Sequence, residues 1–251
     1  MSRRARWGGP IVAGVVFVLV WQAIVWLGSY PEYVLPGPLV VATRFGEAWA
    51  DGTMADHFLA TLASVVGGFC VGALIGLPAG YLLARSPVAQ RVLSPYFVAA
   101  EATPILALAP LIFLWFGSGL GARVIVCALV VFFPVLISTM VAIRGVDPRL
   151  LEMGRAFRAT RRQQITSIEV PAAMPGIMGG LRIGVTLAVV GAIVAEWAGG
   201  EKGLGVLINL ARGSLFDIPL MFAALLTIAL LGIACYTLVL GLERLIVGGR
   251  Q

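Results

Sequence analysis

Three ionisable residues, Glu101, Arg182 and Glu196, lie inside long apolar stretches of the chain. A charged side chain in the middle of a membrane costs about 3 kcal/mol unless it faces a polar cavity, a partner or the interface. Glu101 precedes Thr103 and Pro104, where a helix loosened by proline would expose polar groups. Glu101, Thr103 and Glu196 are therefore candidates for lining a polar pathway. Glu196, near the end of its stretch, suits a hydrogen bond at a helix end equally well, and Arg182 is expected to be structural.

Catalytic and metal-binding chemistry is poorly represented in this sequence. It contains a single histidine, His57, which we expect at a membrane interface, and three cysteines inside apolar stretches without metal-ligand spacing. The sequence has neither a G-x-x-x-x-G-K-[ST] phosphate loop nor a G-x-S-x-G nucleophile elbow. We therefore expect a chain that is not an enzyme and that binds no cofactor or metal of its own.

The longest polar stretch, residues 147–171, separates two hydrophobic segments and contains five arginines, namely Arg149, Arg155, Arg158, Arg161 and Arg162. Asp147 followed by Pro148 is typical of a helix start, since the aspartate caps the helix and proline at its first position lacks only an N–H that would be unpaired anyway. Leu150, Met153 and Phe157 then fall at i, i+3 and i+7, on one face of an amphipathic helix.

A second helix is predicted within the same stretch. Thr160 followed three residues later by Gln163 matches a capping box, so we expect a helix that restarts there and runs toward Pro171. The stretch is thus predicted to hold two short helices meeting at a bend. A simpler interpretation is a loop whose arginines only fix the orientation of the chain in a membrane.

The composition indicates an integral membrane protein. The 251 residues are 60% hydrophobic and 12% charged, and the mean hydropathy is +0.99. A soluble domain of this size could not bury so many apolar side chains. The net charge of +6 comes almost entirely from arginines at the ends of apolar segments, a pattern that does not suit nucleic-acid binding.

The apolar segments predict an all-α, polytopic fold with six transmembrane helices. These are residues 10–27, 57–84, 92–116, 124–143, 171–197 and 218–242. The arginine clusters place both termini and the 147–171 stretch in the cytoplasm by the positive-inside rule. Residues 1–56 then form the first helix and an outer loop, and residues 57–251 form the core.

Glycines at every fourth position are expected to form smooth seams where helices pack closely. The second segment carries Gly68, Gly72, Gly76 and Gly80, and the fifth carries Gly176, Gly180 and Gly184 at the same spacing.

Several motifs resemble those of one membrane protein family. Glu152-Met153-Gly154, with Ala156, Ile168 and Pro171, resembles the EAA loop of binding-protein-dependent ABC importer permeases. Four further pieces resemble the permeases for sulfonates, nitrate and taurine and their thiamine-pyrimidine and riboflavin relatives. They are residues 35–38 (LPGP), 104–111 (PILALAPL) with 115–117 (WFG), 180–184 (GLRIG), and 194–196 (VAE) with 203–205 (GLG). Arg158 stands where that family has a glycine, so regular helix is expected at the bend.

The resemblance implies a type I ABC importer permease fold in the cytoplasmic (inner) membrane of a bacterium. It also implies an ATP-binding cassette subunit that binds ATP and Mg, a second permease copy or sister permease, an external solute-binding protein, and the lipid bilayer around the chain. The residues implied to couple to the ATPase are Leu150, Glu152, Met153, Gly154, Arg155, Phe157 and Arg158.

The sequence alone does not identify the transported solute. If Glu101 faces the pathway ionised, it repels anions and accepts hydrogen bonds from a neutral heterocycle. This favours a thiamine pyrimidine precursor or a riboflavin-like solute over a sulfonate, nitrate or taurine-type anion. The alternative function is an ion-coupled secondary transporter without an ATPase, in which Glu101 and Glu196 supply the carboxylates.

Overall fold

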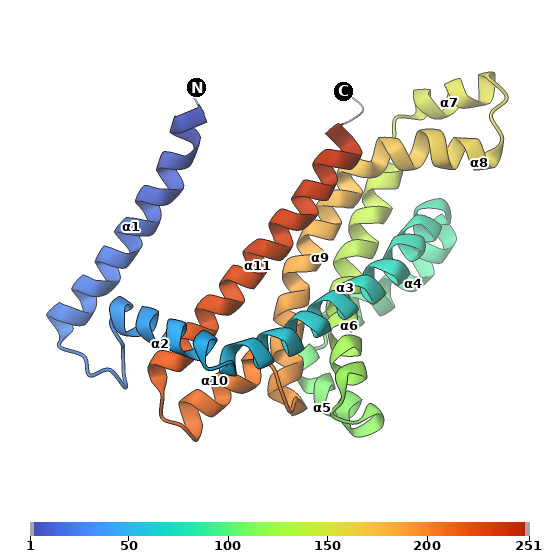
Figure 1. Cartoon of the computed structure of the whole chain (residues 1–251). Coiled ribbons are helices and arrows are strands. Elements are labelled where there is room, and N and C mark those ends of the chain that lie inside the picture. The colour runs from blue at the N-terminus through green and yellow to red at the C-terminus, as the bar shows by residue number, and fades with distance from the viewer. Residues whose placement is uncertain (1–2, 249–251) are drawn as a thin grey trace.

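A computed structural model describes residues 3–248, which contain helices and no strand. The helices are α1 Arg3–Gly28, α2 Pro38–Ala50, α3 Thr53–Arg85, α4 Pro87–Ala102, α5 Ile105–Phe116, α6 Leu120–Arg144, α7 Pro148–Ala156, α8 Arg161–Gln163, the π-helical segment η1 Gln164–Glu169, α9 Val170–Gly199, α10 Leu204–Gly213 and α11 Ile218–Val247. Figure 1 shows a bundle built on α3, α6, α9 and α11, with α1 standing to one side and α2 linking it to the bundle.

Four of the described helices are long and apolar enough to cross a membrane, namely α3, α6, the run Arg161–Gly199 that contains α9, and α11. They match the second, fourth, fifth and sixth predicted spans. The apolar part of α1, Val12–Gly28, is shorter than these. The prediction of six spans with both termini in the cytoplasm therefore stays a prediction.

The third predicted span, residues 92–116, is not one helix. It is divided into α4 and α5, which meet at 90°. Thr103 has an extended backbone with ψ of 121°, because the ring of Pro104 disfavours helical geometry in the residue before it. Pro104 is itself extended and precedes the first residue of α5. The proline noted in the sequence thus breaks the span rather than merely loosening it.

Both predicted glycine seams pack against the same helix, α6. A Cβ added to Gly72 of α3 would lie 2.8 Å from the carbonyl oxygen of Ala128, and one added to Gly76 would lie 3.0 Å from that of Phe132. On α9, a Cβ at Gly184 would lie 3.0 Å from a methyl group of Val135. Close backbone approach therefore holds α3, α6 and α9 together as the centre of the bundle.

Two short helices occupy stretches that the sequence predicted as loops. α2 lies within residues 28–56 and α10 within residues 198–217, and both contribute to one apolar cluster with the start of α11. Arg44 of α2 also pairs with Asp217, which caps α11, at 2.8 Å. These helices close one end of the bundle (Figure 1).

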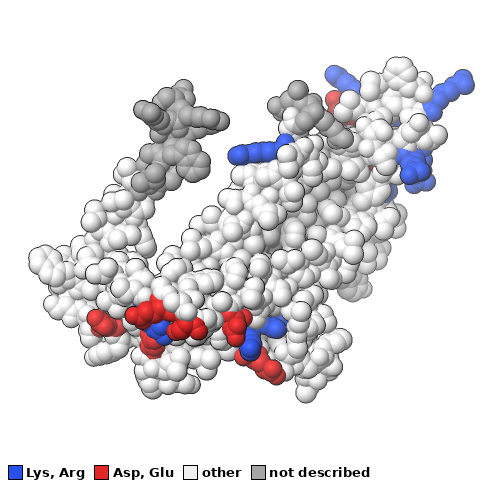
Figure 2. Space-filling view, viewed as in Figure 1, with Lys and Arg blue, Asp and Glu red and all other residues white. Residues whose placement is uncertain are grey.

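The charges separate toward the two ends of the molecule. Figure 2 shows the acidic residues gathered along the end formed by α2 and α10, and mostly basic residues at the opposite end, around α7 and α8. Both chain ends lie at the same end as α7 (Figure 1). This arrangement is the one that the positive-inside rule assigns to a cytoplasmic α7.

Candidate functional site

The first half of the 147–171 stretch folds as predicted. The side chain of Asp147 accepts a hydrogen bond of 2.9 Å from the backbone N–H of Arg149, and Pro148 is the first residue of α7. The helix ends at Ala156, where the N–H of Ala159 returns to the carbonyl of Gly154 at 2.9 Å.

The expectation of regular helix at Arg158 is wrong. Arg158 has a φ of 54°, in the left-handed region, so the bend keeps the geometry that the glycine of the family motif would adopt without strain. Its side chain stays exposed beside the bend. This left-handed residue accompanies the return of the chain after α7, where the N–H of Ala159 bonds to the carbonyl of Gly154.

The apolar face of α7 is directed away from the rest of the chain. Leu150, Met153 and Phe157 are 38%, 49% and 81% exposed. The adjacent flank holds Leu151, which packs into a cluster at the ends of α3, α6 and α9, and Gly154, which is buried. The helix is therefore anchored along one flank, and three apolar side chains beside that flank stay exposed.

Gly154 is what allows this anchoring. A Cβ added there would lie 2.5 Å from Cδ1 of Ile168 in η1, so the absence of a side chain lets α7 lie against the π-helical segment. Glu152 and Arg155 are exposed as well. All seven residues predicted to couple to an ATPase are thus on α7 or on the bend that follows it.

The second half of the 147–171 stretch begins as predicted, but its end differs from the prediction. Thr160 and Gln163 form both hydrogen bonds of a capping box. The helix does not stop at Pro171, however, but continues through η1 into α9. Within η1 the N–H of Val170 bonds to the carbonyl of Ile165, five residues back. This wider turn alters the i to i−4 ladder just where Pro171 would disrupt it, and the helix passes through the proline.

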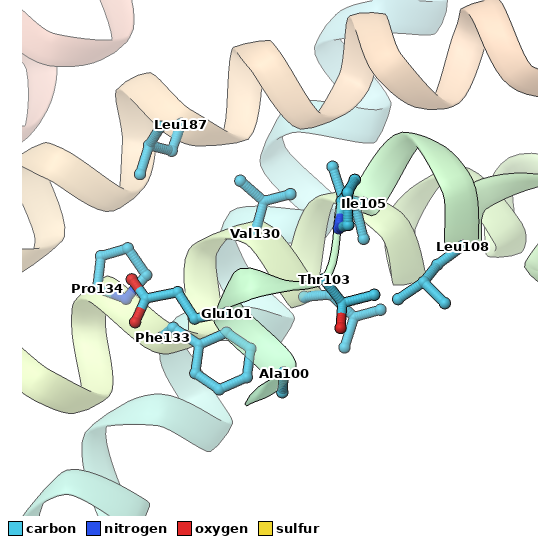
Figure 3. Close-up of a pocket in the computed structure, with 11 residues that line it drawn as sticks. Ala100, Glu101, Thr103, Ile105, Leu108, Val130, Phe133, Pro134 and Leu187 are labelled. Carbon is cyan, nitrogen blue, oxygen red and sulfur yellow. The ribbon is translucent and has the colours of Figure 1, made fainter. Parts of the chain in front are cut away.

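Glu101 and Thr103 lie together on the wall of a pocket of about 580 Å³ at the break between α4 and α5. The pocket is lined by Ala100, Glu101, Thr103, Pro104, Ile105, Leu108, Leu129, Val130, Phe133, Pro134 and Leu187. Figure 3 shows the carboxylate of Glu101 beside Pro134, with Leu187 of α9 on the opposite wall. Two polar side chains therefore meet a mostly apolar lining, as in sites for small organic ligands.

Leu187 was not singled out in the sequence, whereas Phe133 is one of several aromatic residues there that suit either stacking on a solute or packing and lipid contact. Phe133 packs edge-on against both Phe97 and Phe132, and it supplies an aromatic wall. An aromatic residue inside an apolar span carries no local signal that separates a pocket wall from lipid contact.

Glu196 lies away from this pocket, at the far end of α9. It is 2% exposed. Its Oε1 accepts a hydrogen bond of 2.7 Å from the hydroxyl of Thr61, and its Oε2 accepts one of 2.7 Å from the N–H of Gly205. These bonds match the helix-end alternative, and they tie α9 to α3 and α10.

Arg182 lines a second hollow of about 420 Å³, whose other lining residues include Ser138 of α6, Gly180 of α9 and Tyr236 of α11. Its Nε lies 3.2 Å from a carboxylate oxygen of Glu243 on α11. The pair joins two helices, in agreement with the structural role expected for Arg182. Within the part of the chain that the structure describes, no group of His, Cys, Asp and Glu side chains is arranged to hold a metal ion.

Comparison with known proteins identifies a family match. The family model described as "Binding-protein-dependent transport system inner membrane component" matches residues 72–248. The riboflavin transport system permease protein RibX of Chloroflexus aurantiacus is 45% identical over 98% of this chain and 92% of its own length. The putative aliphatic sulfonates transport permease protein SsuC of Bacillus subtilis is 34% identical over 96% of this chain and 87% of its own length.

A third relative and a solved structure extend the likeness. The formylaminopyrimidine transport permease protein ThiX of Halalkalibacterium halodurans is 30% identical, over 96% of each chain. The inward-facing MetNI methionine ABC transporter has a chain that aligns with a TM-score of 0.67 at 21% identity, covering 75% of this chain and 93% of that one. At this level of identity the structural match concerns the fold alone.

Proposed function

This chain belongs to the family of binding-protein-dependent transport system inner membrane components, and we propose that it passes a small heterocyclic solute along the Glu101 pocket while an ATPase docks on α7. The chain is the multi-pass permease of an ABC importer in the cytoplasmic membrane, and ATP is hydrolysed on a separate subunit. Such permeases work with an ATPase subunit and a solute-binding protein. The family favours this function over an ion-coupled carrier.

The single observation that carries the docking proposal is the exposure of Phe157, at 81%, directly after a helix that Leu151 anchors to the bundle. An exposed aromatic side chain next to two apolar residues is typical of an interface anchor that enters a pocket of a partner. Leu150 and Met153 extend the same apolar face, and Glu152 and Arg155 supply contacts at its rim. ATP and Mg bind to the partner subunit in this arrangement.

The proposed assembly contains two permeases, either two copies of this chain or this chain and a sister permease. The two permeases enclose the solute pathway, and two ATPase subunits bind the two α7 helices. Closure of the ATPases around ATP tilts the spans through α7 and opens the path outward. The external binding protein delivers the solute at the end formed by α2 and α10.

The pocket chemistry supports a neutral ring compound as the solute. The carboxylate of Glu101 repels an anion and accepts hydrogen bonds from ring N–H or O–H groups. The aromatic wall formed by Phe133 suits stacking with a planar ring. The relative in Chloroflexus aurantiacus is named as a riboflavin permease, so a riboflavin-like solute is the first to test, with a formylaminopyrimidine second.

The docking proposal is tested by purifying the tagged chain from native membranes in mild detergent and measuring how much nucleotide-binding subunit comes with it. Phe157→Ala should reduce the copurified ATPase by about tenfold or more. Phe216→Ala is the matched control, because Phe216 is 80% exposed and lies in the loop before α11. Equal recovery of the ATPase with both variants would contradict the proposal.

The solute proposal is tested by uptake of labelled riboflavin into vesicles that contain the complete transporter. Glu101→Gln should lower uptake by roughly tenfold, since a neutral amide is a weaker acceptor than a carboxylate. Arg91→Gln, which also replaces one exposed charge of α4 with an amide, is the control. If Glu101→Gln leaves the uptake of riboflavin, formylaminopyrimidine and taurine unchanged, Glu101 does not line the path.

A further inference from the structure

A buried carboxylate lies at the base of the α7–α8 unit, in a position that the EAA motif does not specify. Glu169, the last residue of η1, is 3% exposed. It forms an ion pair with Arg85, the last residue of α3, and it accepts a hydrogen bond of 3.0 Å from the hydroxyl of Tyr81. The guanidinium of Arg85 in turn lies 5.8 Å from the centre of the Tyr81 ring. These three residues are called the clasp below.

The clasp joins two elements that are far apart in the sequence. Tyr81 and Arg85 are at the α7 end of α3, whereas Glu169 is where η1 becomes α9. Arg144 from the end of α6 donates to the carbonyl of Leu83 at 3.0 Å, so it also holds this end of α3. The α7 end of α3 is therefore bound both by α6 and by the segment that carries α7.

A physical reason for such a brace lies in η1 itself. A π-helical turn has a wider ladder than an α-helix and is a natural point of deformation in a long helix. α7 rests on η1, because Gly154 lies against Ile168. A movement of α7 would therefore bend η1 first and would not reach the spans, unless the far end of η1 were fixed to the bundle.

The chemistry of the clasp makes it resist separation. A carboxylate that is almost fully buried is strongly disfavoured once its partner is removed, so Glu169 and Arg85 are held together. The cation at the last residue of α3 is also favoured by the partial negative charge of the helix end. Since the glycine seam of α3 packs on α6, a displacement at Glu169 is passed to both helices.

We propose that the Glu169–Arg85–Tyr81 clasp transmits the movement of the α7–α8 unit to α3, so that ATPase closure moves the bundle instead of bending η1. This inference rests on the proposed docking of an ATPase on α7. It assigns to Glu169, Arg85 and Tyr81 a positioning role, away from the solute and from the ATPase surface.

The test is made with the complete transporter in proteoliposomes, with ATPase copurification, ATP hydrolysis and riboflavin uptake measured on the same preparations. Arg85→Met should leave copurification unchanged and hydrolysis within about twofold, while uptake per ATP hydrolysed falls roughly tenfold. Arg91→Met, an exposed arginine of α4, should change none of the three.

Two further variants keep the test informative if Arg85→Met fails to fold. Tyr81→Phe removes a single hydrogen bond without leaving a cavity and should lower uptake per ATP to a smaller extent. The double variant Arg85→Glu with Glu169→Arg exchanges the two charges. It should recover part of the uptake per ATP that either single change loses. If the pair were only structural, the double variant would recover the folding yield but not the uptake per ATP.

The outcomes separate this inference from the proposed function. If the wild-type chain copurifies with no ATPase, the docking proposal fails, and the clasp fails with it. If the wild type docks and transports but Arg85→Met and Tyr81→Phe keep the wild-type ratio of uptake to hydrolysis, only the clasp is overturned. Loss of copurification in Arg85→Met would also overturn it, since the pair would then serve to hold α7 in place.

Discussion

The hydroxyl of Thr61 donates a hydrogen bond of 2.7 Å to Oε1 of Glu196 and so joins α3 to α9 at the end of the bundle opposite α7. The same hydroxyl accepts a bond of 2.8 Å from the N–H of Leu204, and Oε2 of Glu196 accepts one from Gly205. Two backbone N–H groups at the start of α10 are thus satisfied by one carboxylate and one hydroxyl. This network fixes α10 against the two spans.

Replacing Glu196 with methionine should destabilise the chain, because the N–H of Gly205 then loses its acceptor in a buried site and the hydroxyl of Thr61 keeps only the carbonyl of His57, at 3.2 Å. A buried donor left unpaired costs about 1–3 kcal/mol, so a clear fall in the midpoint of thermal unfolding in detergent is expected. Glu196→Gln is the control, since its amide oxygen still accepts from the N–H of Gly205 and its NH₂ group can donate to the hydroxyl of Thr61, which then donates to the carbonyl of His57.

The same pair of variants separates a structural role from a role in the solute path. If Glu196 contacted solute, Glu196→Gln would alter riboflavin uptake while leaving the unfolding midpoint unchanged. The hydrogen bonds predict the reverse pattern, with near-normal uptake for glutamine and a stability defect for methionine. A methionine variant as stable as the wild type would contradict the network.

Gly154→Val should separate α7 from η1. A Cβ at this position would lie 2.5 Å from Cδ1 of Ile168, and the two methyl groups of valine add further bulk to a contact that is already too close. We expect normal insertion in the membrane but weaker ATPase copurification, by roughly tenfold. Gly154→Ala is the milder control, since the end of the Ile168 side chain can shift. Normal copurification with valine would show that α7 need not rest on η1.

Arg158→Gly should stabilise the bend. Arg158 has a φ of 54°, and relief of left-handed strain in a residue with a Cβ is worth about 1 kcal/mol. The expected result is a small rise in the unfolding midpoint with coupling unchanged, measured as uptake per ATP hydrolysed. A fall in coupling with no loss of ATPase docking would assign the guanidinium of Arg158 a direct role in contacts with the partner.

Local signals in the sequence predicted the elements that depend on local chemistry. Asp147 with Pro148 and Thr160 with Gln163 mark helix starts because capping involves residues two or three positions apart. The glycine seams of α3 and α9 were readable because a repeat of four residues lies on one helix face. Long apolar runs likewise gave four spans to within a few residues.

The features that the sequence did not predict depend on contacts between distant segments. α2 and α10 are too short to be recognised as spans, and a shared apolar cluster holds them in place. The ion pair between Arg85 and Glu169 joins residues that are far apart in the sequence. No local pattern around either residue predicts this pairing. The π-helical turn that ends at Val170 likewise has no local sequence signal other than the presence of Pro171.

Pro104→Ala should allow α4 and α5 to align. Proline at this position forces Thr103 into an extended backbone, and alanine removes that restriction and restores a backbone donor. Straightening would close the pocket around Glu101, so we expect riboflavin uptake to fall while membrane insertion is kept. Pro110→Ala, within α5, is the control, because it changes a proline that the helix already accommodates.

The bend itself can be followed by spin labels at Val98→Cys and Leu114→Cys, two exposed positions on α4 and α5, after the three native cysteines are replaced. In Pro104→Ala a second, longer distance should appear, toward about 24 Å, which is the separation along a continuous helix at 1.5 Å per residue. A single unchanged distance would mean that Pro104 is not required. The bend would then be held by the packing of Ala109 and Ile112 against α6 and α9.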